Sequence, residues 1–380
     1  MINYVPILKW KRAEQRALQE LTDKSGVRPL LELVMPTVSL YKKIEKVKVK
    51  KTPDEMTSEI VNKFKQQKII EIPEEILKSW GKSEVYVDFT LLHDPHDTIQ
   101  LKLESIDRIL HIGIEKGLNL IPVVNLNDDK RIKEAICELS GKHNLGLCLR
   151  ITQSDLTDVK TLNEKIDAFL LEFNLGVATT DLLIDIKAID GDIGQYSFYF
   201  SLGQKIENLI NWKHFIFTSG AFPENLNDCK FEELTPLPRV DWQYWLNARK
   251  NKHVRMPIFS DYTIRNPVFK EALQYFDPTT SIKYTHEDNW LIMKGKKRKF
   301  DLYLANANLL VGSKYYYGSD FSWGDAKISE KADYFKKYIK EKLQSGTGSN
   351  EDWIAWCINH HMMLVLFQIA NLPVPSVTSA

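Results

Sequence analysis

The chain has 380 residues, of which 43% are hydrophobic and 27% charged, so it can bury a large core and form two or three domains. Its formal net charge of +1 gives no global field that would favour nucleic acid or a membrane surface. The four cysteines include no C-x-x-C pair, which argues against a zinc knuckle. Because the sequence shows neither a leader-like N-terminus nor a run of about 18 apolar residues, we expect a cytoplasmic protein without a membrane segment.

Apolar runs typical of buried strands alternate with segments of helical spacing over the first two thirds of the chain. Eight strands are expected, at residues 4–11, 28–35, 84–91, 118–125, 145–151, 180–188, 213–220 and 254–261. Helical segments are expected between them, at residues 12–24, 54–67, 73–80, 98–117, 128–140, 158–174, 195–210 and 239–250. Strands that alternate with helices in this way favour a parallel sheet.

The number and length of these units favour a closed barrel over an open sheet. A (β/α)8 barrel typically takes about 250 residues, which matches the predicted alternation. An open doubly wound sheet is the alternative, but it would favour a glycine-rich first turn, and residues 9–14 (Lys-Trp-Lys-Arg-Ala-Glu) contain no glycine. The sequence therefore predicts an α/β fold, with a (β/α)8 TIM-like barrel at residues 1–265 and a C-terminal α+β extension at residues 266–380.

The extension breaks the alternation. A hairpin is expected at residues 281–295, and helices at 300–311, 325–344 and 350–371. We expect the extension to pack on the barrel and to replace or elaborate its eighth helix. A separate basic stretch at residues 42–51 suits an exposed edge strand, since lysines discourage edge pairing. A nucleic-acid patch is the alternative there, but no aromatic side chain interleaves the lysines.

The predicted strands end in polar or charged residues, at the end of the barrel where active sites of this fold lie. Side chains alternate along a strand, so some of these residues will point outward. Because burying charges costs several kcal/mol each unless they are paired, we expect most of them to share one site. The set consists of Lys9, Lys11, Glu32, Asp88, Asn125, Arg150, Asp185, Lys187, Ser219 and Asp261.

This set suits two chemistries. Basic residues can clamp a phosphate while a carboxylate activates water, or two carboxylates can cleave a glycosidic bond. The lysines favour the anionic substrate. We predict catalytic roles for Glu32, Asp88, Asp185, Lys187 and Asp261. We predict substrate binding by Lys9, Lys11, Asn125, Arg150, Ser219 and Tyr262.

The sequence does not determine whether the protein binds a cofactor. Asp88, Asp185 and Asp261 could hold a divalent metal, although no signature spacing supports this. Lys187 could form a Schiff base only if it were desolvated, and the nearby charge of Asp185 works against that.

Two motifs in the extension have structural explanations. His360 and His361 point about 100° apart on a helix, so we expect a buried core or interface histidine and not a metal site built from the pair. The segment Phe-Ser-Trp-Gly-Asp at 321–325 is expected to cap a helix through Ser322 or Asp325. A loop over the barrel mouth is the functional alternative for this segment.

Several short motifs, spread in order over the chain, resemble the beta family protein group of phages and bacterial genomes. They lie at residues 4–14, 182–185, 219–223, 260–262, 283–285, 322–325 and 359–361. Ala13 and Ser260 stand where the family pattern has glycine, and Lys283 stands where it has arginine, which loses the planar guanidinium. The resemblance implies a phage or mobile-element setting, often beside host–phage conflict genes, and supplies no reaction or cofactor.

Two functions follow as hypotheses. The first is a hydrolase that acts on an anionic, phosphate-bearing substrate, such as a nucleotide or a nucleic-acid end. The second is a non-catalytic sensor or binding protein in phage–host conflict, including anti-phage defence, with a protein partner on the extension. The aromatic helix at 350–371 motivates that partner, although its packing on the chain's own barrel is favoured. Oligomeric state and catalysis itself stay open.

Overall fold

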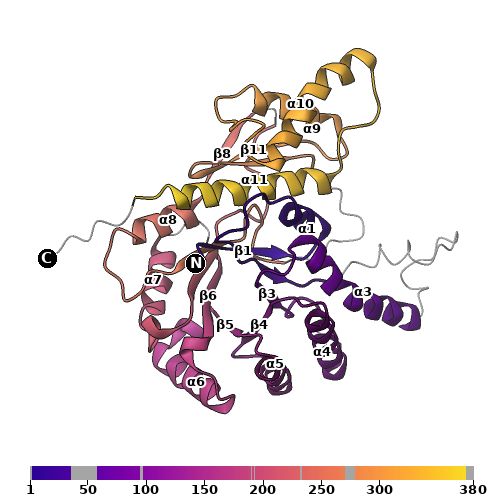
Figure 1. The fold of residues 1–380 in the computed structure, drawn as a ribbon. Helices are drawn as coiled ribbons and strands as arrows, with labels where there is room; N and C mark the ends of the chain where they lie inside the picture. Colours follow the sequence, from indigo (N-terminus) through magenta and orange to yellow (C-terminus); the bar gives the residue numbers. More distant parts are fainter. Residues whose placement is uncertain are drawn as a thin grey trace.

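Within the described residues 2–35, 58–94, 97–189, 191, 193–231, 233–269 and 279–373, eight parallel strands close into a barrel in the computed structural model (Figure 1). The last strand pairs with both its predecessor and the first strand, which completes the ring. The strands are β1 (Tyr4–Lys9), β2 (Leu30–Glu32), β3 (Val85–Asp88), β4 (Leu120–Asn125), β5 (Leu147–Thr152), β6 (Thr180–Ala188), β7 (Phe215–Gly220) and β9 (Ile258–Asp261). The prediction of a (β/α)8 barrel is confirmed.

Helices cover the outside of this barrel (Figure 1). They are α1 (Arg12–Gln19), α3 (Ser58–Ser79), α4 (Ile99–Glu115), α5 (Lys130–His143), α6 (Val159–Glu172), α7 (Ile193–Gly203) and α8 (Val240–Ala248). The one helix α3 replaces the two that we expected at 54–67 and 73–80. A proline usually ends or kinks a helix, but Ile69, Ile72 and Ile76 on both sides of Pro73 are buried in the core. Tertiary packing therefore keeps the helix continuous.

The alternation of side chains along each strand divides the core into two layers. One layer fills the barrel and includes Ile7, Leu30, Cys148 and Leu183. The other layer lies between the strands and the helices. Because the direction of side chains repeats every two residues along a strand, the residue two positions after each of these four also faces inward. These residues are Lys9, Glu32, Arg150 and Asp185.

A polar group also closes the N-terminal end of the barrel interior. Arg28 donates a hydrogen bond to Tyr86 Oη (2.9 Å) and one to Asp181 Oδ2 (3.1 Å), and Tyr86 donates to the same Asp181 oxygen (2.8 Å). All three residues are buried. The interior is therefore apolar in the middle and charged at both ends.

The extension contains a three-stranded antiparallel sheet in the order β10–β11–β8. Its hairpin, β10 (Ile282–His286) and β11 (Asn289–Met293), is the one expected from the sequence, whereas β8 (Thr235–Pro238) was not expected. A segment with two prolines is a poor strand candidate, and it is tolerated here because β8 is an edge strand. β8 precedes the last barrel strand, β9, in the chain, yet it belongs to the sheet of the extension. The expected domain boundary at residue 265 therefore stays a prediction.

The extension also contributes α9 (Asp301–Val311), α10 (Trp323–Glu341) and α11 (Asn350–Ala370). α11 packs on α1 and on β10 and lies across the barrel between α1 and α8 (Figure 1). It thus takes the place of the eighth barrel helix, as expected.

α11 is long and apolar enough to cross a membrane by length and composition, but 61% of its most apolar window is buried in the protein, as in a core helix. Trp353, Trp356 and Met362 are buried within the chain, while Phe367 is exposed. Packing within the chain itself therefore accounts for most of the aromatic face that motivated a protein partner. The basic stretch at 42–51 lies outside the described residues.

We predict that the contact of α10 with α11 tolerates no added methyl group. A Cβ at Gly324 would lie 2.1 Å from the carbonyl oxygen of Trp356, which is backbone and cannot rotate away. Gly324→Ala should therefore lower the melting temperature by several degrees. Gly141→Ala is the matched control, because a Cβ on this exposed helical glycine meets nothing within 4 Å. It should stabilise the protein by about 0.5 kcal/mol. Equal melting temperatures in thermal unfolding would contradict the close packing.

Candidate functional site

Charged side chains from four strands meet around Arg150 at the C-terminal end of the barrel. Arg150 lies on the interior face of β5, and Glu32, Asp88 and Asp185 lie on the interior faces of β2, β3 and β6. None of the four is more than 3% exposed. Side chains alternate between the inward and outward faces of each strand, and all four of these residues lie on the inward face, above the apolar side chains that fill the barrel.

The Arg150 guanidinium binds all three carboxylates. It donates from Nη2 to Glu32 Oε1 (2.8 Å), from Nε to Asp185 Oδ2 (3.1 Å) and from Nη1 to Asp88 Oδ2. It also donates to the phenol oxygen of Tyr262 (3.0 Å), which in turn donates to Asp185 Oδ2 (2.6 Å). The planar fork of arginine suits several acceptors at once, which a lysine ammonium could not reproduce.

Two lysines complete the charge balance. Lys9 Nζ donates to Glu32 Oε2 (3.0 Å) and to the carbonyl of Pro267 (3.0 Å). Lys187 Nζ lies 2.9 Å from Asp185 Oδ2, 3.0 Å from Tyr262 Oη and 3.5 Å from Glu32 Oε1. Three cations thus face three carboxylates. We call Lys9, Glu32, Asp88, Arg150, Asp185, Lys187 and Tyr262 the Arg150 cluster.

These contacts fix the protonation of the acids. Burial alone would raise the pKa of Glu32, but the charges of Arg150, Lys9 and Lys187 outweigh it and lower the pKa to about 2. Burial likewise opposes ionisation of Asp185, and the charges of Lys187 and Arg150 hold its pKa far below the usual range. Both groups are therefore ionised acceptors at neutral pH and are not poised as general acids.

The two lysines are more accessible than the acids beneath them. The Lys187 side chain is 39% exposed and that of Lys9 11%, whereas the carboxylates lie on a buried floor. Lys187 has a left-handed backbone (φ +57°), which is costly for a residue with a Cβ. Its backbone N–H donates to Asp185 Oδ1 (2.8 Å), and this bond helps to hold the turn that aims the amine over the cluster.

Four of the expected site residues lie outside the cluster. Lys11 is exposed beside it, with Nζ 5.0 Å from the centre of the Phe269 ring. Asn125 faces inward but binds Thr90 and Asp128 instead. Ser219 is buried on the outward face of β7, because its neighbours at two-residue spacing, Phe215 and Phe217, pack toward the helices.

The fourth, Asp261, requires a correction. We expected it to converge with the other acids, but the inward positions of this strand end are Ser260 and Tyr262, so Asp261 points outward. It accepts hydrogen bonds from Tyr4 Oη (2.7 Å) and His361 Nε2 (2.9 Å) between the barrel and α11. Alternation was the signal that could have separated Asp261 from the set.

A second buried polar network begins at Asp261. His361 binds Asp261 on one ring nitrogen and Thr285 Oγ1 on the other (2.8 Å), and the Thr285 carbonyl binds His360 Nε2 (2.7 Å). His360 Nδ1 then binds Asp325 Oδ2 (2.7 Å). Both histidines are fully buried, which confirms the expected core role. Ser322 caps α10 as expected, since its Oγ accepts from the Asp325 N–H (3.1 Å).

Asp88, Asp185 and Asp261, which were considered as metal ligands without a supporting spacing, do not come together, because Asp88 and Asp185 are bound to Arg150 while Asp261 lies in the other network. Among the residues that the structure describes, no group of three or more His, Cys, Asp or Glu side chains is arranged to hold a metal ion.

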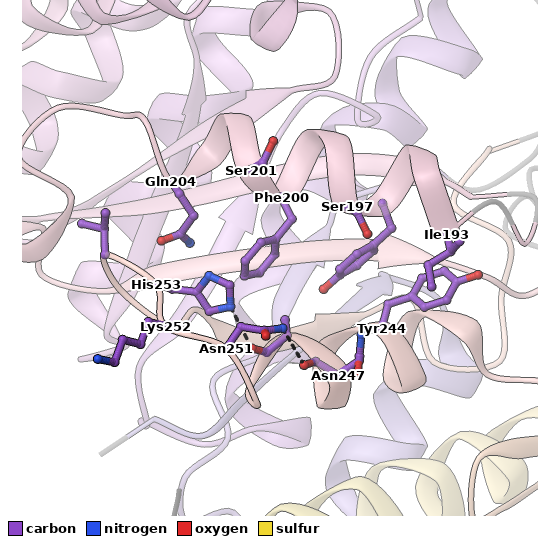
Figure 2. Close-up of a pocket in the computed structure, with 13 residues that line it drawn as sticks. Ile193, Ser197, Phe200, Ser201, Gln204, Tyr244, Asn247, Asn251, Lys252 and His253 are labelled. Carbon is purple, nitrogen blue, oxygen red and sulfur yellow. Dashed lines mark hydrogen bonds between the residues drawn. The ribbon is translucent and has the colours of Figure 1, made fainter. Parts of the chain in front are cut away.

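A cavity of about 400 Å³ lies elsewhere, where α7 and α8 face each other on the outside of the barrel (Figure 2). Its polar side chains bind nearby backbone carbonyls: His253 Nε2 lies 2.7 Å from the Ala248 oxygen, and Asn251 donates to the Asn247 carbonyl. None of the expected site residues lines it. The candidate site is therefore the Arg150 cluster.

We predict that removing the central cation is strongly destabilising. Arg150→Leu leaves three buried carboxylates without their shared partner, which should cost about 3–5 kcal/mol of unfolding free energy. Arg131→Leu is the matched control, because its pair with Asp129 is exposed and should leave stability unchanged. Urea unfolding at neutral pH measures both. Similar losses in the two variants would show that Arg150 is not the hub of a buried network.

The low pKa of Glu32 predicts acid sensitivity. Its folded-state pKa of about 2 lies below the ordinary value of 4.5, so its stabilising contribution is present above that value and is lost as pH falls toward 2. The free energy of unfolding should therefore fall across this window. Glu32→Gln should be less stable at neutral pH but should show a flatter pH dependence. Parallel pH profiles of the two proteins in urea unfolding would contradict the assignment.

Comparisons with known proteins complete the description. The family model described as Beta protein matches residues 4–367. No curated protein matches the chain at a significant level. Two crystal structures of tryptophan synthase from M. tuberculosis are similar in part. One, a ligand-bound form, is 9% identical with a TM-score of 0.35 and covers 69% of this chain and 82% of that chain. The other, a ligand-free form, is 10% identical with a TM-score of 0.34 and covers 68% and 82%.

Likeness at this level carries no argument about function. The family match, by contrast, spans nearly the whole chain, from the start of β1 into the last turn of α11. The protein belongs to the Beta protein family.

Proposed function

We propose that the C-terminal end of the barrel binds a small anionic, phosphate-bearing ligand, with Lys9 and Lys187 as its principal contacts. The observation that carries the proposal is the layering of charge at this end. Lysine amines form the accessible rim, and the carboxylates lie beneath them, almost completely buried. An approaching ligand meets cations first, and this arrangement attracts anions.

The spacing of the two amines suits a single phosphate group. Both bind the same carboxylate, that of Glu32, and both lie over the Tyr262 ring, at 5.3 and 5.5 Å from its centre. One tetrahedral oxyanion can therefore contact both. Lysine acts as a point charge toward phosphate, so neither amine needs to leave its carboxylate completely to bind the ligand.

The geometry favours binding over hydrolysis. General acid–base catalysis by the carboxylates would require a group that changes protonation near neutral pH, but the pKa values of Glu32 and Asp185 lie far below neutrality. A non-catalytic binding or sensor protein is thus the better-supported function. We place it, on the family resemblance alone, in phage–host conflict.

Hydrolysis of a bound phosphoester is the second candidate. One observation favours it: burial lowers the pKa of Lys9 in spite of the opposing charge of Glu32. A lysine with a lowered pKa is a stronger acid, and Lys9 could protonate the leaving oxygen of a phosphoester. Water would attack phosphorus as the P–O bond breaks, and the proton that this water loses would restore the ammonium.

Calorimetric titration with pyrophosphate and with ATP tests the proposal. Lys187→Met keeps the aliphatic stem but removes the charge, and it should weaken binding about tenfold or more, equivalent to about 1.4 kcal/mol. Lys336→Met on the exposed face of α10 is the control and should bind as the unaltered protein does. A failure of both probes to bind, or equal affinity in the two variants, would contradict the proposal. Release of inorganic phosphate during the titration would select the hydrolase candidate.

A further inference from the structure

The cavity between α7 and α8 lies apart from the Arg150 cluster, on the outside of the barrel (Figure 2). Neighbouring helices usually close the space between them by fitting side chains into each other's grooves. Here several of the side chains that line the gap are small, namely Ser197 and Ser201 on α7 and Ala248 on α8. They leave about 400 Å³ open, which lies within the range of roughly 300–1,000 Å³ that small-molecule sites occupy.

Four aromatic rings form a continuous wall of this cavity. The ring centres of His253 and Phe200 are 4.9 Å apart, and those of Phe200 and Tyr196 are 5.9 Å apart. The Tyr196 ring in turn lies 5.3 Å from that of Tyr244. Phe200 and Tyr196 also pack edge-on against Phe217 of β7, which holds both rings against the barrel. A fixed aromatic surface of this kind favours flat aromatic ligands, which can stack on it.

Tyr196 brings an unused hydrogen-bonding group to the cavity. The residue is only 3% exposed, yet no described residue forms a hydrogen bond with its phenol. Buried phenols usually find a partner. Burial raises the pKa of Tyr196, so the phenol stays protonated and can donate. A ligand in the cavity would supply the missing acceptor.

Two further polar groups line the cavity without a partner in the described part of the chain, the hydroxyl of Ser197 and the side-chain amide of Asn247. Hydroxyl and amide groups both donate and accept hydrogen bonds. They therefore suit the alternating donors and acceptors on the edge of a heterocyclic base. An aliphatic ligand would cover these groups without replacing their bonds to water, which is costly.

The charges and apolar groups of the lining narrow the ligand class further. None of the described lining residues is acidic, so a cationic ligand would find no counter-charge. Lys252 is exposed, and one exposed lysine does not make an anion site. Ile193 and Val254 also line the cavity and are 54% and 53% exposed, so a ligand there could cover apolar surface that now meets water. The lining therefore favours an uncharged ligand with apolar faces and polar edges.

We propose that the cavity between α7 and α8 binds a flat, uncharged heteroaromatic compound of about the size of a purine nucleoside. The ring of the ligand stacks on the aromatic wall, and its polar edge forms hydrogen bonds with Tyr196, Ser197 and Asn247. This site is separate from the Arg150 cluster and does not depend on anion binding there.

Calorimetric titration of the full-length protein with adenosine and with guanosine tests the proposal. Neither probe carries a phosphate, so the result is independent of the Arg150 cluster. At least one of them should bind at one site per chain with a Kd on the order of 0.1 mM, as expected for a ligand of this size. Octyl glucoside, an uncharged aliphatic probe of similar size, should bind at least about tenfold more weakly below its micelle concentration. Absence of binding by both nucleosides, or equal binding of octyl glucoside, would overturn the proposal.

A variant that fills the cavity locates the site. Ser197 is exposed on α7, so Ser197→Trp should fold normally and place an indole ring where the ligand lies. It should abolish nucleoside binding while the melting temperature changes little. Binding that survives in this variant with unaltered affinity would place the ligand elsewhere and overturn the proposal.

A pair of tyrosine variants tests the hydrogen bond without changing the shape of the cavity. Tyr196→Phe keeps the ring and removes only the hydroxyl, and it should weaken nucleoside binding about fivefold. Tyr199→Phe is the matched control, because Tyr199 lies on the same helix but does not line the cavity. Equal affinities in the two variants would contradict recognition by the Tyr196 phenol.

Discussion

One buried guanidinium determines how the C-terminal end of the barrel is charged. Arg150 binds carboxylates from three different strands, and each of them would be costly to bury alone. Lys9 and Lys187 neutralise the remaining charge and lie toward solvent. The arrangement is cooperative, since removing any central member leaves others unpaired. It also holds the Glu32 and Asp185 carboxylates in place and keeps them ionised. Ligand binding at this end of the barrel would therefore involve the two lysines.

A second set of buried polar contacts couples the barrel to the extension. The chain of hydrogen bonds from Tyr4 through Asp261, His361, Thr285 and His360 fixes α11 against β1 and β10. Buried polar networks of this kind must be satisfied to be tolerated, and they therefore hold one relative orientation of the elements they join.

Much of the fold could be predicted from local pattern. The apolar runs that end at Lys9, Glu32, Asp88, Arg150 and Asp185 marked both the strands and the end where charges gather. The errors had physical reasons. Asp261 was placed with the other acids because its strand end was considered without the inward or outward direction of the side chain. β8 was missed because Pro236 and Pro238 oppose strand formation, and only pairing with β11 in the folded chain overrides that.

The site itself was harder to predict than the fold. Which charges pair depends on contacts between residues more than 100 positions apart, as between Glu32 and Arg150. Sequence pattern gives the face of each element, whereas the depression of a carboxylate pKa depends on its neighbours in space.

The central claim is that a cationic rim over a neutralised floor binds an oxyanion. Crystals soaked with tungstate, a heavy tetrahedral analogue of phosphate, test it most directly through the anomalous signal of the metal. The account predicts an anomalous peak at the C-terminal end of the barrel, within hydrogen-bond reach of both Lys9 Nζ and Lys187 Nζ. Peaks confined to other surfaces of the protein, with none at these two amines, would contradict it.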